Sequence, residues 1–301
     1  MEICVFGAGS LGTLIGGVLA REHSVTLVGR EPHVSAIERD GLRISGAIEE
    51  TTYPAAATVP PAAVDLAVVT VKSFDTAGAA TALAACSLDG ALSLQNGMGN
   101  EGILAETLDC PVLAGTCTYG ARRGAPGTVE CTGIGEIVIG ARDGGQSSLA
   151  DRVTAAFSDA GLVADSSAEM PRRLWAKLAV NAGINATTAL ARIPNGSLLD
   201  GPGESVAEGA ARETARVARQ AGIDLSDEQA IRRTRAVADA TAENTSSMQQ
   251  DVLAGKRTEV DAINGYVVET ADGDASVPIN ETLAGLVRAW ERERGLRDAD
   301  S

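Results

Sequence analysis

Cysteine, histidine and lysine are scarce in this sequence of 301 residues, and each scarcity excludes a kind of chemistry. The five cysteines are odd in number and scattered, with the spacing of neither a zinc site nor a disulfide framework. Two isolated histidines, His23 and His33, disfavour a histidine-based metal site and a Ser–His triad. We therefore predict no metal ion, and the cysteine usage fits a reducing cytoplasm.

Long apolar runs and an excess of positive charge are also missing. No run of about 18 uncharged apolar residues occurs, and the N-terminus MEICVFGAG lacks the basic flank of a signal peptide. Forty acidic residues against 25 basic ones give a net charge of −15 and a pI of about 4.6. Because nucleic acids and anionic membranes need a basic surface, neither is predicted as a partner. The acidic, lysine-poor composition suggests a high-GC or salt-adapted organism.

The two halves of the chain have different hydrophobic patterns. Up to about residue 166, apolar runs alternate with helical patterns, which predicts a parallel sheet covered by helices. Strands are expected at 2–9, 24–30, 65–72, 91–97 and 111–120, with an edge hairpin at 127–141. After that the period is helical, over 170–190, 204–222, 226–252, 257–271 and 280–294. The prediction is an α/β chain with a Rossmann-type doubly wound domain (1–166) and an all-helical domain (167–301).

A glycine-rich turn joins the first predicted strand to the first helix. It has the pattern GxGxxG and consists of Gly7, Ala8, Gly9, Ser10, Leu11 and Gly12. At such a junction, glycines allow a tight turn, admit a pyrophosphate to the backbone and let helix pack on strand. The helix N-terminus adds a partial positive charge for the phosphates. We interpret the turn as a dinucleotide site, against the alternative of a merely structural turn.

The residue after the second strand distinguishes NADP from NAD. NAD sites usually present an acidic residue to the ribose 2′-hydroxyl there, whereas this sequence has Arg30, whose guanidinium suits a 2′-phosphate. NADPH/NADP is therefore the predicted cofactor, with NADH as the alternative because Glu31 follows directly. Two further loops at strand ends carry Lys72 and Asn96, which could instead be an exposed lysine and an ordinary Asn-Gly turn.

The helical pattern RLWAKLAVNAGINATTAL carries one narrow polar stripe. Lys177, Asn181 and Asn185 recur every four residues and share one helix face. A solvent-facing edge in this chain would be expected to carry Glu, Asp and Arg, so the stripe suggests donors facing a cavity. A lysine beside a nicotinamide can act as a general acid for a carbonyl oxygen. Its orienting carboxylate could be Glu259, which could equally be a surface helix charge.

These residues carry a resemblance to the ketopantoate reductase (2-dehydropantoate 2-reductase) family. It extends over nearly the whole chain, through FGAGSLG, VTVKSFDT, LQNGMGN, LWAKLAVNAGINATTAL, AENTSSMQQD and RTEVDAINGYVV. The lysine–asparagine–asparagine helix and the SSM…TE-D-ING segment are the specific parts, since GxGxxG is shared by many dehydrogenases. The resemblance implies a helical domain like the C-terminal domain of 6-phosphogluconate dehydrogenase.

The resemblance also implies an activity and a set of roles. The activity is NADPH-dependent reduction of 2-dehydropantoate to (R)-pantoate, in pantothenate and coenzyme A biosynthesis, with a 2-keto acid as the partner molecule and a homodimer as an allowed assembly. Lys177 would be the general acid, supported by Glu259, which also lies at the cofactor. The expected substrate-binding residues are Asn96, Asn181, Asn185, Asn244 and Ser247. The expected cofactor-binding residues are the GxGxxG turn, Arg30, Lys72 and Asn96.

Two other functions fit parts of the pattern. One is a different two-domain dehydrogenase, acting on a hydroxy acid, a sugar phosphate or an amino-acid conjugate. A sugar phosphate would require more cations than Lys72 and Lys177 supply. The other is a non-catalytic dinucleotide sensor, which would have no use for a paired lysine and glutamate.

Overall fold

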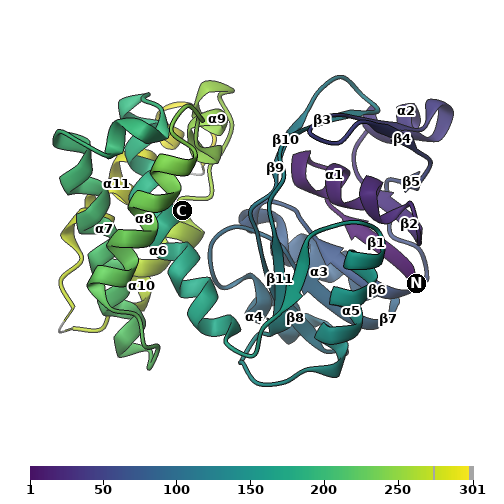
Figure 1. Ribbon diagram of the computed structural model, residues 1–301, viewed down its shortest axis with the longest axis horizontal. Helices are drawn as coiled ribbons and strands as arrows, with labels where there is room; N and C mark the ends of the chain where they lie inside the picture. Colours follow the sequence, from purple (N-terminus) through teal and green to yellow (C-terminus); the bar gives the residue numbers. More distant parts are fainter. Residues whose placement is uncertain (274, 298–301) are drawn as a thin grey trace. The chain divides into compact units, whose positions relative to one another are not determined.

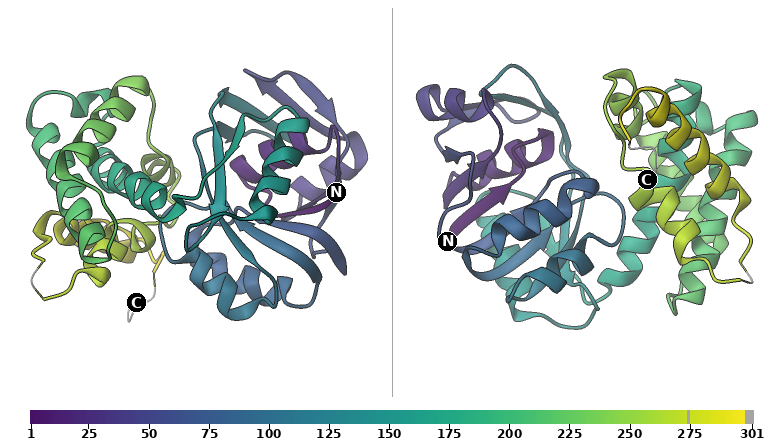
Figure 2. Two further views of the ribbon diagram at one scale, coloured as in Figure 1. Left: turned by 60° about the horizontal axis from the view of Figure 1, so that its bottom comes forward. Right: turned by 180° about the vertical axis from the view of Figure 1, so that it is seen from behind.

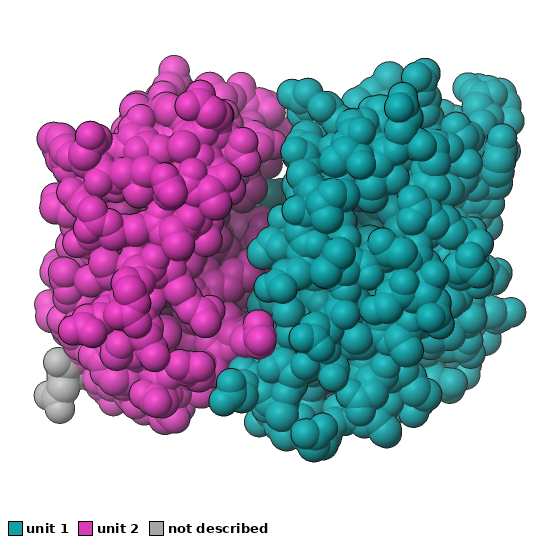
Figure 3. All heavy atoms as spheres, in the orientation of Figure 1, with its two compact units in different colours: residues 1–95, 100–170 teal, residues 96–99, 171–301 magenta. Residues whose placement is uncertain are grey.

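The computed structural model describes residues 1–273 and 275–297, and it divides into two compact units (Figure 3). The sheet unit comprises residues 1–95 and 100–170, and the helical unit comprises residues 96–99 and the chain from residue 171 onward. The first unit thus runs to Met170 rather than to residue 166. The loop at 96–99 groups with the helical unit, although its position in the sequence lies inside the first domain.

A mixed sheet of eight strands forms the centre of the sheet unit. Its order is β12-β11-β8-β7-β6-β1-β2-β5, and β11 runs antiparallel to β8 while the other neighbours are parallel. The strands are β1 (Glu2–Phe6), β2 (Ser24–Val28), β5 (Ala55–Ala57), β6 (Ala63–Val69), β7 (Ser87–Ser93), β8 (Val112–Cys117), β11 (Ile137–Ala141) and β12 (Ala164–Ser166). β1 pairs with β2 on one side and β6 on the other, so the order of strands reverses at β1. The Rossmann-type fold class is confirmed.

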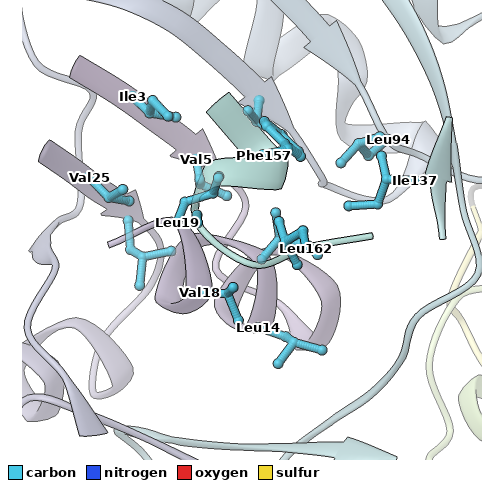
Figure 4. Packing of buried hydrophobic residues seen from close by; sticks show 14 of the residues in the cluster. Ile3, Val5, Leu14, Val18, Leu19, Val25, Leu94, Ile137, Phe157 and Leu162 are labelled. Atoms are coloured by element: carbon cyan, nitrogen blue, oxygen red, sulfur yellow. The ribbon is translucent and has the colours of Figure 1, made fainter. Parts of the chain in front are cut away.

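Alternation along the strands supplies both faces of this sheet with apolar side chains. Ile3 and Val5 of β1 belong to one buried cluster, and Cys4 between them belongs to another. Helices α1 (Ser10–Leu19) and α5 (Ser148–Asp159) pack in the first cluster, and α3 (Thr76–Leu83) and α4 (Asn100–Thr107) in the second. Figures 1 and 2 show the helices on both faces, and Figure 4 shows β1, β2, α1 and Phe157 packing together. This burial holds the carboxyl ends of β1, β2 and β6 in place.

A second sheet corrects the expected hairpin at 127–141. It has the order β4-β3-β10-β9 and consists of β3 (Leu42–Gly46), β4 (Glu50–Thr52), β9 (Gly120–Arg123) and β10 (Thr128–Gly133). β10 pairs with β9 and β3, whereas β11 joins the large sheet, so the two apolar runs of that segment do not pair with each other. The reason is the Gly-rich link GIGE, which lets the chain change sheets. Helix α2 (His33–Asp40) precedes β3.

The helical unit is built around α6, a helix of 22 residues. Its helices are α6 (Met170–Ala191), α7 (Pro202–Gln220), α8 (Asp227–Ala240), α9 (Ser247–Leu253), α10 (Tyr266–Thr270) and α11 (Pro278–Glu293), with short turns η1 (Ser73–Asp75, in the sheet unit) and η2 (Asn195–Leu198). The all-helical prediction is confirmed, but the single helix expected at 226–252 is interrupted after Ala240. The pattern at 257–271 contains a π-helical stretch, η3 (Asp261–Gly265), before α10. Many alanines on α6 and α7 are fully buried, which lets these helices pack closely.

Within residues 1–273 and 275–297, none of the helices combines the length and the hydropathy that crossing a bilayer would need.

Candidate active site

The first and last glycines of the GxGxxG turn are required by the protein's own packing. Gly7 has φ +117°, and a Cβ there would lie 2.7 Å from the backbone nitrogen of Val71. A Cβ on Gly12 would lie 2.2 Å from the Gly7 carbonyl oxygen and 2.3 Å from Oγ1 of Thr70. These glycines let α1 start directly against the ends of β1 and β6.

Gly9 differs, because nothing in the protein requires it to be glycine. A Cβ on Gly9 would have only the Gly7 carbonyl oxygen nearby, at 3.8 Å, and the φ of Gly9 is −79°. Gly9 is also the N-cap of α1, so no side chain caps the first turn, which contains no acidic residue. An open space above bare backbone at a helix N-terminus fits a pyrophosphate. The turn therefore suits a dinucleotide, and Ala8, Ser10 and Leu11 complete it.

Two charged residues, Arg30 and Glu31, follow β2 and have different surroundings. The Arg30 side chain is 89% exposed, and its Nη2 lies 3.6 Å from Oδ2 of Asp75. Glu31 instead accepts hydrogen bonds from the hydroxyl of Ser35, at 2.6 Å, and from its backbone N–H, at 3.3 Å. Glu31 thus stabilises the first turn of α2. Its carboxylate is engaged with Ser35.

The β9–β10 hairpin adds a second guanidinium that the sequence did not reveal. The Arg123 backbone N–H donates to Ser10 Oγ at 3.0 Å, and its Nη1 donates to the Ala8 carbonyl at 3.3 Å. The hairpin is held by His33, whose Nδ1 accepts from the Gly127 N–H at 3.1 Å and whose Nε2 lies 3.1 Å from Thr13 Oγ1. Burial, and secondarily the charge of Arg123, lower the pKa of His33. No local pattern marks this contact, because more than a hundred residues separate Arg123 from the glycine turn.

Lys72 lies where the carboxyl end of β6 turns into η1. It is the N-cap of η1, and the Asp75 N–H donates to its carbonyl at 2.8 Å. Asp75 is the residue that approaches Arg30, so the Lys72 loop and the end of β2 adjoin each other within the sheet unit. The neighbouring Gln95 side chain is buried and donates to the Val71 carbonyl and to Thr76 Oγ1, which fixes the shape of this loop.

The polar stripe on α6 is enclosed to different degrees along its length. Lys177 and Asn181 are half-buried, whereas Asn185 is 6% exposed. Thr188, one turn further, is fully buried and lies 2.7 Å from Ser246 Oγ, the N-cap of α9. The stripe is therefore not a solvent-facing edge of the helix, and its far end is tied to the segment that carries Ser247.

The segment 258–266 packs against α6. The rings of Tyr266 and Trp175 are 5.8 Å apart, and the Asn264 amide donates to the Ala182 carbonyl at 3.0 Å. In the sequence of α6, the two contacts fall on either side of Lys177 and Asn181. Glu259, only 5% exposed, precedes the π-helical turn η3, a geometry that is common at functional sites. Burial removes the alternative of a surface helix charge for Glu259.

Helix α11 and the residues that follow it contact the segment 258–266 through charged side chains. The fully buried Glu291 accepts from the Thr258 N–H at 2.6 Å and from its hydroxyl at 2.7 Å. Arg297 pairs with both Glu291 and Asp261, and Arg288 donates to Asp261 at 2.8 Å. Burial alone would raise the pKa of Asp261, but the guanidinium groups of Arg297 and Arg288 outweigh it and lower that pKa. The residues on both sides of Glu259 are therefore fixed by charged contacts.

Asn96 reaches the same unit through its loop. Gly97 has φ +82°, and a Cβ there would lie 2.5 Å from the Ala262 side chain. The Met98 N–H donates to the Ala262 carbonyl at 2.9 Å. The positive φ and the close approach show why glycine follows Asn96. This contact joins the loop to the π-helical turn.

Asn244 and Ser247 lie at the start of α9 and are exposed. The Asn244 carbonyl accepts from the Asn195 N–H at 3.1 Å, and Ser246 rather than Ser247 caps the helix. Ser247 is thus left at the first helical position with its hydroxyl outside the cap. The sequence did not single out Asn264, whose side chain makes long-range contacts with Ala182 and Asn280.

The structure thus gathers the proposed residues into two groups. The sheet unit holds the glycine turn, Arg30 and Lys72, and the helical unit holds the α6 stripe, Glu259, the Asn96 loop and the start of α9. In the part of the chain that the structure describes, no group of three or more His, Cys, Asp or Glu side chains could hold a metal ion. The chemistry available is that of a nucleotide cradle and of a lysine set among amides.

Both halves of the chain match models of one protein family. Residues 3–144 match the family described as ketopantoate reductase PanE/ApbA, and residues 169–291 match the ketopantoate reductase PanE/ApbA C-terminal family.

Curated relatives extend over nearly the full length. A 2-dehydropantoate 2-reductase of Halobacterium salinarum is 47% identical over 304 residues, which cover 97% of this chain and 100% of the relative. The enzyme of that name from Bacillus subtilis is 33% identical, over 97% of this chain and 98% of the relative.

Solved structures show the same fold. A PanE/ApbA family ketopantoate reductase from Ralstonia eutropha superposes with a TM-score of 0.89 at 34% identity, covering 98% of this chain and 100% of the other. A D-mandelate dehydrogenase solved with NADH and anilino(oxo)acetate gives 0.91 at 23% identity, with 99% and 100% covered, a likeness of fold alone. The chain therefore belongs to the ketopantoate reductase family of NAD(P)-dependent oxidoreductases.

Proposed function

We propose that this chain reduces the C2 ketone of 2-dehydropantoate to (R)-pantoate with NADPH, in pantothenate and coenzyme A biosynthesis. The observation that supports it best is the half-buried Lys177 on α6, a helix against which the segment carrying the buried Glu259 packs, in a chain 47% identical to a 2-dehydropantoate 2-reductase. The names of the homologous enzymes suggest the class of substrate, and the side chains of the site suggest the role of each residue.

Lys177 is the proposed general acid. Its ammonium group donates a proton to the C2 oxygen as the ketone becomes an alcohol, which avoids an unstable alkoxide. Glu259 keeps the ammonium charged and oriented between turnovers. Asn181 and Asn185 donate from the same helix face to the hydroxyl and carboxylate of the substrate, because amides hold an anion without adding charge.

Three further residues complete the proposed substrate site. Asn96 reaches the reacting carbon through the loop that packs on Ala262, and Asn244 and Ser247 bind from the start of α9. The exposure of Asn244 and Ser247 leaves their side chains available to a ligand.

The glycine turn, Arg30 and Lys72 would hold the dinucleotide, which when bound supplies hydride to C2. NADPH is preferred over NADH in this proposal for two reasons. Arg30 and Arg123 are guanidinium donors near the turn, and Glu31 is engaged with Ser35 instead of being available for a ribose hydroxyl. Lys72 lies at the end of β6, where it would approach the nicotinamide end.

The proposal places the enzyme in the cytoplasm, in keeping with five scattered cysteines whose spacing predicts no disulfide framework. Self-association as a homodimer stays a prediction, which light scattering would decide.

The direct test is a spectrophotometric assay of cofactor oxidation with 2-dehydropantoate. We expect turnover with NADPH, with kcat/KM at least about tenfold lower for NADH. Other 2-keto acids, including an aryl one, serve as competitors in the same assay. Faster turnover of another keto acid would reassign the substrate, and absence of turnover with every acid at both low and high salt would refute a reductase.

The role of Lys177 has its own test. Lys177→Ala should lower kcat by about 100-fold or more while leaving the affinity for NADPH largely intact, because only the proton transfer is lost. Lys256→Ala, an exposed lysine in the same unit, is the matched control and should keep full turnover. Near wild-type turnover of Lys177→Ala would remove lysine from the mechanism.

A further inference from the structure

A hollow of about 360 Å³ in the helical unit is lined by cations. Its lining residues are Arg172 of α6 and Gln229, Arg232, Arg233 and Ala236 of α8. Its volume is that of a small-molecule site. Three arginines and no carboxylate line it, although the chain has 40 acidic residues against 25 basic ones. A charge inversion of this kind points to an anionic ligand.

The spacing on α8 places four of these residues on one face. Gln229, Arg232, Arg233 and Ala236 follow the i, i+3, i+4, i+7 pattern that an amphipathic helix normally reserves for apolar contacts. The apolar face of α8 lies elsewhere, at the buried Ala230, Thr234 and Ala238. The arginine face is therefore an additional face that the packing of α8 does not need.

Several donors on the lining are already oriented. Nε of Arg172 donates to the Asp224 carbonyl at 2.8 Å, which fixes the direction of its guanidinium. The Gln229 carboxamide oxygen accepts from the Ser226 N–H in a capping box, so its NH₂ group is held at the N-terminal end of the face. Preorganised donors lose less entropy on binding.

Two acidic residues at the start of α8 form ion pairs, one of them with a lining arginine. Asp227 pairs with Arg219 at 2.8 Å, and Glu228 lies 3.7 Å from Arg232, with both side chains of that pair well exposed. Arg233 forms no ion pair with any residue in the ranges that the structure describes. At physiological ionic strength the screening length is about 8 Å. Salt therefore weakens the repulsion between a bound anion and distant carboxylates more than its attraction to the three lining guanidinium groups.

The hollow is separate from the proposed active site. Arg172 lies about 180° around α6 from Asn181 and about 140° from Lys177, at 100° per residue. Arg172 and the substrate stripe thus lie on different sides of α6, and no residue of the proposed mechanism lines the hollow.

We propose that this hollow binds a small phosphate-bearing molecule, of the monophosphate or pyrophosphate class, through bidentate contacts from Arg172, Arg232 and Arg233. Guanidinium groups match phosphate oxygens in pairs, and Gln229 adds a neutral donor. Ala236 gives the hollow a small apolar wall against which the organic part of an ester packs. The inference does not depend on the identity of the reductase substrate.

Calorimetric titration with inorganic pyrophosphate and with glycerol 3-phosphate, at constant ionic strength, tests the proposal. Arg233→Ala should weaken binding by about tenfold or more, since it removes a charged donor. Arg152→Ala removes the same charge from an exposed position on α5 and should change the affinity by less than about twofold. Arg233→Lys should restore only part of it, because an ammonium lacks the bidentate geometry. Tighter binding of pyrophosphate or of the ester tells which source of phosphate the hollow prefers.

Labelling of arginines with phenylglyoxal, read by peptide mass spectrometry, locates the anion. Protection of Arg232 and Arg233, with Arg152 unprotected, supports the hollow. Protection confined to Arg30 and Arg123 would place the anion at the glycine turn and overturn the proposal. Equal affinities of the wild type and the two alanine variants, or no binding at millimolar concentrations, would overturn it as well.

Discussion

The glycine turn of the sheet unit and the segment 258–266 of the helical unit are built in opposite ways. The turn takes its shape from Gly7 and Gly12, five residues apart, and from the strands on either side of it. The segment takes its shape from partners far away in the sequence, such as Glu291, 33 residues from Thr258, and Ala182, 82 residues from Asn264. One is encoded locally, and the other is assembled by tertiary contacts.

This difference follows from what each region has to hold. A pyrophosphate is bound by backbone N–H groups, so the turn needs the absence of side chains, which glycine provides wherever it stands. A proton donor needs one side chain oriented to within a fraction of an ångström, and that requires support from outside the segment. Local changes should therefore damage the first region most, and remote changes the second.

The largest effect on stability is expected from the remote support. Glu291→Ala leaves Arg297 and the Thr258 donors without their buried acceptor, and such losses cost about 3–5 kcal/mol. Urea unfolding measures the free energy, and kcat should fall as well because Glu259 adjoins Thr258. Glu281→Ala, on an exposed position of the same helix, is the control. If both variants cost the same, the clamp does not support the segment.

Alanine variants of Gly12 and Gly9 should affect stability and cofactor binding differently. Gly12→Ala forces a Cβ to 2.2 Å from the Gly7 carbonyl, so the free energy of unfolding should fall by about 1–3 kcal/mol or more. Gly9→Ala meets no protein atom within 3.4 Å and should cost less than about 1 kcal/mol, the change being confined to an N-cap. It should nevertheless weaken NADPH binding, which fluorescence titration detects. Unchanged NADPH affinity in Gly9→Ala would show that the open space is not the pyrophosphate cradle.

Arg123 offers a smaller and more selective effect. If its guanidinium contacts the 2′-phosphate, Arg123→Ala should raise the Kd for NADPH by about tenfold and leave NADH unchanged, because NADH lacks that group. Arg122→Ala is a close control, since the Arg122 guanidinium pairs with Glu130, at 2.6 Å. An equal loss of affinity for NADPH and NADH would indicate that Arg123 only stabilises the glycine turn and does not contact the 2′-phosphate.

The same division explains how far the sequence could be interpreted. The Rossmann-type fold and the helical second domain followed from hydrophobic periodicity, and residues 7–12 from their place between a strand and a helix. The α6 stripe was visible because its polar residues share one face. Each of these signals is local or periodic, which makes it accessible without a structure.

What the sequence could not give depends on pairing between distant segments. The apolar runs at 127–141 alternate as a hairpin does, yet their partners lie in two different sheets. The helical period at 257–271 does not distinguish an α-helix from a π-helix. In the structure, Asn264 and Ala262 of the π-helical turn contact Ala182 and Gly97, which are distant in the sequence. Arg123 is a candidate because the hairpin places it against Ala8 and Ser10. Its neighbours in the sequence do not distinguish it from an ordinary exposed arginine.

The smallest effect concerns pH, at the contact between the hairpin and α1. His33 Nδ1 accepts from the Gly127 N–H, so the neutral ring is the form that fits, and burial followed by the charge of Arg123 lowers its pKa from 6.5. The folded pKa lies below the unfolded one, so the stabilisation is complete above pH 6.5 and is lost as the pH falls through the lowered value. Thermal unfolding at about pH 7.5 and about pH 5.5 measures the loss, which should be smaller in His33→Asn, whose amide keeps its charge state. Arg123→Ala should also reduce the loss, since it removes one of the two causes of the shift. An acid sensitivity that is identical in the wild type and both variants would mean that the hairpin does not depend on the neutral ring. The local turn would then hold its shape without the long-range contact from the second sheet.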